Sequence, residues 1–215
     1  MSVANTLPEG LEIREIDDPK YGAEIAELRF STYQYDTLFS RMYPIYTDPA
    51  GTKSWMTTRE ITIMKMKTTK TAAIFDTTTG MMLAFIKLTV PVELPLEGSA
   101  AENLPAYPEG FNVPLQNKFR SLLKASDKYY NKQADSYIGA LYTLPSHQGR
   151  GYGSALLSWA IEQARATSSR IFIQASPSGH NLYLKLGWKD LEKLTIDLSE
   201  FGGETYPIYN MVKEA

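Results

Sequence analysis

The sequence predicts an α/β protein, and three observations point to this class. Segments with the alternating polarity of strands and segments with the helical spacing of apolar residues follow one another along the chain. In the second half, a strand pattern at 136–144 leads through the glycine-rich stretch HQGRGYGSALL into a helix pattern at 152–166. The chain has 215 residues, 43% of them hydrophobic, which is enough to bury one substantial core, so we expect a single domain over 1–215.

The composition excludes several classes of function. With no cysteine, the chain has no disulfide, thiolate metal site or cysteine nucleophile, and its two histidines are too few to favour a histidine-rich metal site. A formal net charge of −2 lacks the basic excess typical of nucleic-acid binding. No apolar run approaches the roughly 18 residues that span a bilayer, and the start MSVANTLPEG lacks the pattern of a secretory signal. We therefore expect a cytoplasmic protein, with the nucleus as the alternative, that binds neither nucleic acid nor membrane and holds no metal.

Hydrophobic spacing and turn residues predict the other elements. One predicted helix is expected to begin with a capping box formed by Thr57 and Glu60. A proline-rich stretch at 91–113 predicts a long irregular segment, and with the helical pattern that follows it forms an insertion or lid over about 91–132. The predicted helices lie at 19–33, 55–67, 115–132 and 179–188, and the predicted strands at 11–16, 71–76, 82–90, 170–176, 193–199 and 206–213.

The glycine loop is the strongest functional signal. Glycines before a helix let backbone N–H groups converge on a phosphate at the positive end of that helix. The spacing does not fit the dinucleotide fingerprint G-x-G-x-x-G, and no Gly-Lys-Ser/Thr of an ATP-type loop occurs. Residues 148–153, QGRGYG, match a third pattern, Q/R-x-x-G-x-G/A. The alternative is a glycine turn that only connects a strand to a helix.

Two stretches together resemble the GNAT superfamily of acetyl-CoA-dependent N-acetyltransferases. LYTLPSHQGRGYGSALLSWAIEQA resembles the family's coenzyme-binding motif, and ASPSGHNLYLKLGWKDL resembles its LYxKLGF segment, with Trp188 where Phe is usual. The resemblance covers about 136–197, and QASPSGHNLYLKLGW is similar to a branch common in fungi. It implies a mixed twisted sheet of about seven strands, with helices on both faces and a parallel strand pair that splays apart.

The resemblance also implies where acetyl-CoA, the acyl donor, would bind. Its thioester and pantetheine arm would lie along the splayed strand, and its pyrophosphate would lie on the glycine loop. Ser176 stands where many members have an asparagine that bonds the pantetheine, which is a departure from the pattern. The implied strand residues are Leu141, Tyr142 and Thr143, and the implied loop residues are Gln148, Gly149, Arg150, Gly151, Tyr152, Gly153 and Ser154.

Acetyl transfer to an amine needs a proton donor for the leaving thiolate and a proton acceptor for the amine. Tyr183 matches the family's position for the donor, and the alternative is a tyrosine that only packs. Glu93 and Asp135, which flank the insertion, are the candidate bases. His147 and His180 are expected to be solvated instead.

We therefore expect an enzyme that transfers acetyl from acetyl-CoA to a primary amine of a small molecule by direct attack in a ternary complex. Acetylation of protein lysines or N-termini is the alternative, and a catalytically inactive acyl-CoA-binding module is the second. The last strand is expected to complete the sheet or to pair with another subunit, so both a monomer and a homodimer remain open. Four tyrosines after the first helix either line an aromatic acceptor pocket or, as we favour, pack as ordinary loop and core residues: Tyr33, Tyr35, Tyr43 and Tyr46.

Overall fold

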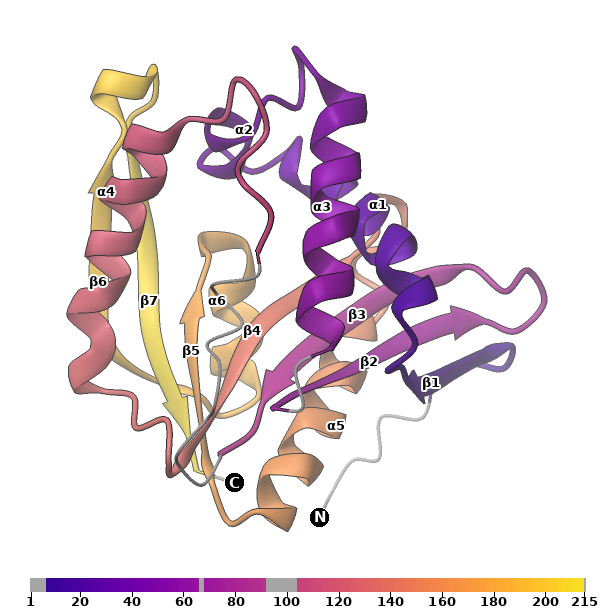
Figure 1. Ribbon diagram of the computed structural model, residues 1–215. Helices are drawn as coiled ribbons and strands as arrows, with labels where there is room; N and C mark the ends of the chain where they lie inside the picture. The colour runs from indigo at the N-terminus through magenta and orange to yellow at the C-terminus, as the bar shows by residue number, and fades with distance from the viewer. Residues whose placement is uncertain (1–6, 66–67, 92–103, 215) are drawn as a thin grey trace.

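A computed structural model describes residues 7–65, 68–91 and 104–214. In these residues seven strands form one sheet in the order β1-β2-β3-β4-β5-β7-β6 (Figure 1). All neighbouring strands are antiparallel except β4 and β5, which are parallel, so the expected mixed sheet is confirmed. The strands are β1 (Leu11–Glu15), β2 (Thr69–Asp76), β3 (Met82–Thr89), β4 (Asp135–Thr143), β5 (Arg170–Ala175), β6 (Lys189–Asp197) and β7 (Thr205–Lys213).

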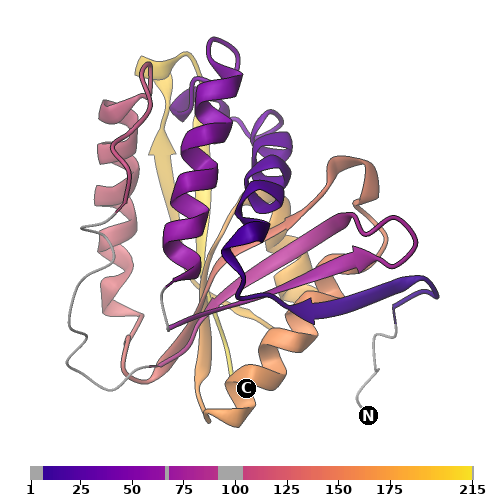
Figure 2. The same ribbon diagram turned by 45° about the vertical axis from the view of Figure 1, so that its right-hand side comes forward.

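Helices cover both faces of the sheet (Figures 1 and 2). One face carries α5 (Tyr152–Ala166) and α6 (Pro177–Lys185), and the other carries α1 (Gly22–Tyr33) and α3 (Pro49–Met64). On that second face, the short α2 (Phe39–Met42) and the longer α4 (Val113–Lys124) pack over β6 and β7. None of the helices in the described residues is long and apolar enough to cross a membrane.

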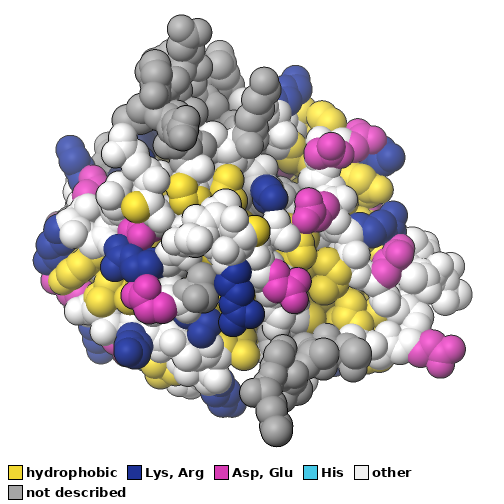
Figure 3. All heavy atoms as spheres, turned by 90° about the horizontal axis from the view of Figure 1, so that it is seen from below, with side chains coloured by type: hydrophobic (Ala, Val, Ile, Leu, Met, Phe, Trp, Pro, Cys, Tyr) yellow, Lys and Arg dark blue, Asp and Glu magenta, His cyan; other side chains and the backbone are white. Residues whose placement is uncertain are grey.

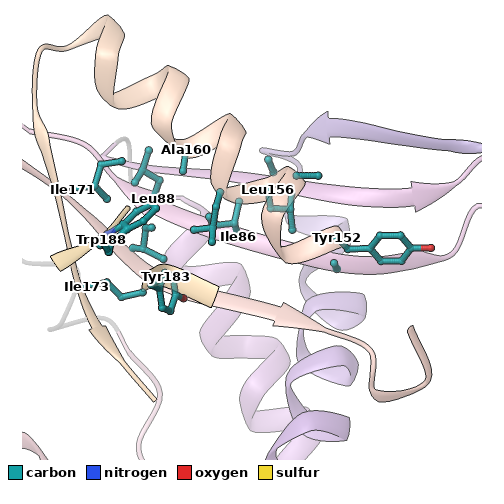
Figure 4. Close-up of a cluster of buried hydrophobic side chains, with 14 of the residues drawn as sticks. Ile86, Leu88, Tyr152, Leu156, Ala160, Ile171, Ile173, Tyr183 and Trp188 are labelled. Atoms are coloured by element: carbon teal, nitrogen blue, oxygen red, sulfur yellow. The ribbon is translucent and has the colours of Figure 1, made fainter. Parts of the chain in front are cut away.

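The largest buried cluster lies between α5 and the sheet (Figure 4). The helix buries Leu156, Ala160 and Ala164 completely, and they recur every four residues along one side. They join Ile86 and Leu88 of β3 in this cluster. The 3.6-residue period predicted this helix with the bounds that the structure has.

The start of α3 differs from the expectation. The helix begins at Pro49, and the side chain of Asp48 caps it by accepting the Gly51 N–H at 2.9 Å. Thr57 lies inside the helix, where its hydroxyl donates to the Lys53 carbonyl at 2.9 Å. The expected capping box is therefore wrong. Asp48 and Pro49 form a pair that is typical of turns, but here Asp48 is the helix cap and Pro49 is the first helical residue.

The C-terminal strand lies inside the sheet. β7 pairs with β5 on one side, where Ile173 faces Met211, and with β6 on the other, where Leu194 faces Ile208. It therefore completes the sheet of its own chain. On the face shown in Figure 3, acidic and basic side chains are interspersed, in keeping with the small net charge of −2.

Candidate active site

The parallel strands β4 and β5 separate soon after they begin. They pair only from Asp135↔Arg170 to Tyr137↔Phe172, although both strands continue beyond that point. On its other side β4 carries an irregularity at Gly139, because Ile138 and Ala140 face consecutive residues of β3. Such a bulge bends a strand and increases its twist. The expected splayed pair is confirmed, and Figure 1 shows the two strands diverging.

A cavity of about 620 Å³ opens where the strands separate. Its volume lies in the range of small-molecule sites, roughly 300–1,000 Å³. Its walls come from both strands, from α1 and the segment after it, and from α3, α4, α6 and β7. Within it, residues 138–143 of β4 present a backbone edge that β5 no longer pairs, which suits hydrogen bonding to the amides of an extended ligand.

The glycine loop lies at the end of β4 and opens α5. Gly149 and Gly151 have φ angles of 75° and 84°, a left-handed conformation that side chains disfavour. Gly151 is the N-cap of α5, and the first bond of the helix joins the Ala155 N–H to the Gly151 carbonyl. The N–H groups before Ala155 therefore have no acceptor within the helix, and such unpaired N–H groups are what an anion site requires.

The third glycine of the loop has a different physical reason. A Cβ at Gly149 or Gly151 would meet no atom within 4 Å, whereas a Cβ at Gly153 would lie 3.0 Å from Cδ2 of Leu182. Gly153 therefore lets α5 pack closely against α6. The first two glycines set the backbone conformation of the loop, and the third sets its distance from the neighbouring helix.

The other residues expected at the coenzyme divide into two groups. The strand residues Leu141, Tyr142 and Thr143 line the cavity, as do Gln148 and Ser176. The remaining residues of the loop lie outside the cavity lining. The Arg150 guanidinium donates to the Ser146 carbonyl at 3.3 Å, and the side chain of Tyr152 is buried in the core, so only its backbone is placed to serve a ligand. Contact of any of these residues with acetyl-CoA stays a prediction.

Tyr183 of α6 lines the cavity, and Figure 4 shows its side chain near that of Trp188 in the buried cluster. Its ring packs edge-on against Trp188, 5.6 Å between centroids, and Gly179 makes room for it, because a Cβ there would lie 2.9 Å from the ring. Burial raises the pKa of the Tyr183 hydroxyl above its usual value, with a smaller contribution from Tyr137. The hydroxyl therefore keeps its proton at neutral pH, which suits a proton donor.

The two carboxylates expected as bases find no support in the structure. Glu93 lies outside the described residues. Asp135 is the first residue of β4, at the far end from the glycine loop, and it does not line the cavity. Arg170 donates to both of its oxygens, at 2.9 and 2.8 Å, and the Asn131 N–H donates at 2.9 Å. Asp135 is thus a buried, fully paired carboxylate that joins the first residues of the parallel strands.

Neither histidine lines the cavity. His180 lies against β6 and β7, where its Nε2 is 2.8 Å from Asp190 and its ring stacks on Tyr209 at 3.7 Å. The ring of His147 lies 2.9 Å from the Ser146 hydroxyl. The sequence suggested a solvated His180, whereas the structure holds its ring between a contact with Asp190 and the face of Tyr209.

Asp36 is a cavity residue that the sequence did not reveal. Among the described residues lining the cavity, it is the one carboxylate. Its Oδ1 accepts the N–H groups of Leu38 and Phe39 at 2.9 and 3.0 Å, and its Oδ2 accepts the Tyr206 hydroxyl at 2.7 Å. Burial and the charge of Asp36 both raise the pKa of Tyr206, so that hydroxyl remains a donor to the carboxylate. In the sequence, Asp36 could not be told from an ordinary turn aspartate.

A second missed feature is a buried charged cluster behind the cavity wall, formed by Arg29, Arg59, Glu60 and Lys87. Arg29 and Lys87 each bond to the fully buried Glu60, and Arg59 lies 3.2 Å from it. Burial alone would raise the pKa of Glu60, but these three cations together lower it to about 2, so the group is ionised. Two of the cluster's members, Arg29 and Arg59, line the cavity.

Aromatic rings surround these charges. Arg29 also donates to the Tyr33 hydroxyl, which accepts from the Tyr142 hydroxyl at 3.3 Å. Tyr33 stacks on Phe39 with centroids 4.4 Å apart. Of the four tyrosines considered from the sequence, Tyr33, Tyr35 and Tyr43 line the cavity, whereas Tyr46 is 70% exposed and does not. Tyr33 and Tyr43 also pack in a buried core cluster, as we favoured, so the role of these rings as an acceptor pocket stays a prediction.

We compared the sequence and the fold of this chain with those of known proteins. Residues 116–188 match the model of the acetyltransferase (GNAT) family. No curated protein matches the chain. A mosquito protein, arylalkylamine N-acetyltransferase like 5b, superposes with a TM-score of 0.62 at 14% identity, over 95% of this chain and 100% of that chain.

Two bacterial structures are also similar. Histone acetyltransferase HPA2 and related acetyltransferase from Corynebacterium glutamicum has a TM-score of 0.60 and 19% identity, over 95% of this chain and 96% of that chain. The protein yncA from Salmonella typhimurium, solved with its cofactor acetyl-CoA, has a TM-score of 0.55 and 14% identity, over 96% of this chain and 94% of that chain.

The resemblance to GNAT acetyltransferases is thereby confirmed, both in the matched segment and in the fold. The match over residues 116–188 agrees with the expected class of enzyme, an acetyl-CoA-dependent N-acetyltransferase, for which acetyl-CoA is the acyl donor. The expected fungal branch is not tested by these comparisons and stays a prediction.

Proposed function

We propose that this chain, acting as a single domain, transfers acetyl from acetyl-CoA to a primary amine of a small molecule by direct attack in a ternary complex. One observation carries the proposal. The cavity of about 620 Å³ is continuous from the splayed strands and Tyr183 to Asp36 and the aromatic residues of α1 and α4. Donor and acceptor would therefore meet in one space, as direct attack requires.

We assign acetyl-CoA to the part of the cavity beside the splayed strands, where backbone groups would hold it. The pyrophosphate would lie on the N–H groups that open α5, and the pantetheine amides would pair with the free edge of β4. The acetyl carbonyl would accept an N–H near Tyr142 or Thr143, which stabilises the negative charge that develops on this oxygen during attack. Ser176, at the other side of the splay, is within the same cavity lining.

The acceptor half favours a small molecule over a peptide. Gln116, Phe119 and Leu123 of α4 line the cavity, and the ring of Phe119 lies edge-on to Phe39 at 6.0 Å. The predicted insertion thus contributes a wall where a peptide-binding enzyme needs an open groove. The name of the mosquito protein, an arylalkylamine N-acetyltransferase like 5b, is in keeping with an amine acceptor among aromatic rings.

Two side chains have the chemistry that the reaction needs. A neutral amine nitrogen forms the new bond to the acetyl carbon, and the bond from that carbon to sulfur breaks. The amine loses a proton, which we assign to Asp36 directly or through water, in place of the two carboxylates expected from the sequence. The leaving thiolate gains a proton, which we assign to Tyr183.

The test combines binding and turnover. Isothermal titration should show that the protein binds acetyl-CoA, and a panel of small amines with detection of free thiol should reveal transfer. Initial velocities with both substrates varied should give intersecting lines, since parallel lines would indicate a covalent acetyl-enzyme. Absence of acetyl-CoA binding would overturn the proposal. Turnover of peptides alone would favour the protein acetyltransferase, and binding without any turnover would favour the inactive module.

A further inference from the structure

The charged cluster behind the cavity wall contains more positive charge than its one carboxylate can balance. Arg29 of α1, Arg59 of α3 and Lys87 of β3 all face the single carboxylate of Glu60. Among the described residues, neither arginine has another carboxylate within salt-bridge distance. The buried Nε of Arg29 also has no hydrogen-bond partner there.

The surplus does not depend on the state of the lysine. Burial, the largest influence, lowers the pKa of Lys87, while Glu60 opposes this shift. Even with Lys87 neutral, two arginines face one ionised glutamate. A positive charge that is largely shielded from water and lacks a counter-ion is costly, so an anion in the adjacent cavity would stabilise this site. Guanidinium groups bind carboxylates and phosphate-like oxyanions such as phosphonates through two parallel N–H donors.

The arginines lie close to the reacting end of the cavity. Both arginines line the cavity, and their side chains are 11% exposed for Arg29 and 26% exposed for Arg59. Hydrogen bonds connect Arg29 through Tyr33 to Tyr142 of the splayed strand. At another point of the same wall, Asp36 offers a negative charge. The lining of the cavity thus presents one negative charge and two positive charges to a ligand.

We propose that the acceptor is a primary amine that also carries an anionic group, a carboxylate or a phosphonate, which Arg29 and Arg59 bind. This inference rests on the proposed acetyl transfer and adds the chemical class of its substrate. Asp36 would attract the ammonium group, and the arginines would hold the anion, which aligns the nitrogen for attack. The other source of an anion is a phosphate of the coenzyme, and the experiment separates the two.

The experiment compares amines that differ in the anionic group alone. Phenylalanine is paired with 2-phenylethylamine, and 2-aminoethylphosphonate with ethylamine. We expect kcat/KM to be at least about 10-fold higher for the anionic member of each pair. In Arg59→Gln this ratio should fall by about 10-fold, and Arg59→Lys should restore it in part because it keeps the charge but not the fork geometry. The control is Arg165→Gln, an equal change of charge at an exposed position of α5, which should leave the ratio unchanged.

Each result decides something. Equal kcat/KM within the pairs, or an equal loss for both members in Arg59→Gln, would overturn the inference and leave the transferase standing. A loss of acetyl-CoA affinity in Arg59→Gln that matches the loss of activity would assign the anion to the coenzyme. If no amine is acetylated, the proposed function fails, and titration of phenylalanine and 2-aminoethylphosphonate into the CoA-bound protein still tests the anion site. Absence of binding there would overturn the inference as well.

Discussion

At the scale of single residues, Tyr183 provides the most direct test of the chemistry. Tyr183→Phe keeps the ring that packs against Trp188 and removes only the hydroxyl. If that hydroxyl protonates the thiolate, kcat should fall by roughly 100-fold, the lower end of general acid effects, while the Kd of acetyl-CoA stays close to that of the unchanged protein. Steady-state kinetics and calorimetry measure the two quantities. An unchanged kcat would remove Tyr183 from the reaction.

Asp36 is the residue that we propose as the base in place of those expected from the sequence. Asp36→Asn keeps the Oδ1 that accepts from Leu38 and Phe39, so the turn into α2 should survive, but the side chain can no longer accept a proton. We expect kcat/KM to fall by roughly 100-fold near neutral pH. The loss should shrink as the pH approaches the pKa of the amine, about 10 for an alkylamine such as lysine, because the amine then loses its proton unaided. A loss that is the same at every pH would indicate a positioning role instead.

At the scale of elements, the glycine loop is tested by two substitutions with equal strain. Gly151 and Gly80 have φ angles of 84° and 72°, and a Cβ at either would meet no atom within 4 Å. Gly80 lies in the turn between β2 and β3, away from the cavity lining. Each change to alanine should cost about 1 kcal/mol of stability. Only Gly151→Ala should also weaken acetyl-CoA binding, by about 10-fold or more for a loss of 1.4 kcal/mol or greater.

Urea unfolding measures the first effect and calorimetry the second. Equal coenzyme affinity in both variants would mean that the loop is only a connection between β4 and α5, the alternative that the sequence left open.

Elements also differ in how well the sequence predicted them. The helix at 152–166 was predicted within its observed bounds because one apolar side repeats with the helical period against a flat sheet. The first turns of α3 were missed because Asp48 and Pro49 suit a turn and a helix start equally well, and the choice depends on whether the next turn finds a core to pack on. For Trp55 and Met56 that core is a cluster with α1.

At the scale of the whole molecule, the Glu60 cluster joins α1, α3 and β3. Removal of its one negative charge in Glu60→Gln leaves buried cations unpaired, and we expect unfolding to become easier by about 3–5 kcal/mol. Glu60→Asp, which keeps the charge, should lose less. Urea titrations followed by circular dichroism compare the three proteins. Equal stability of Glu60→Gln and the unchanged protein would contradict the assigned role of the cluster.

The same cluster predicts a pH dependence of stability. Folding lowers the pKa of Glu60 from 4.5 to about 2, so its contribution is complete above pH 4.5 and is lost as the pH falls toward 2. The free energy of unfolding should therefore decline over this interval more steeply in the unchanged protein than in Glu60→Gln. Parallel declines would show that other carboxylates carry the acid sensitivity.

The sequence by itself determined the class of protein. The glycine loop, the helix after it and the segment around Tyr183 are local patterns, and a local pattern fixes its own backbone conformation and the side that it buries. Through the resemblance to the GNAT superfamily, these patterns also implied the splayed strands, which the structure confirms, and a coenzyme position beside them, which stays a prediction.

Only the tertiary structure decided the acceptor side. Arg29, Asp36 and Arg59 come from separate parts of α1, α3 and the segment between them, and they share the cavity wall because the two helices pack together on the sheet. What a charged side chain faces depends on elements distant in sequence, and no period along the chain records it. For the same reason Asp135, a plausible base in the sequence, turned out to be tied to Arg170 at the opposite end of β4.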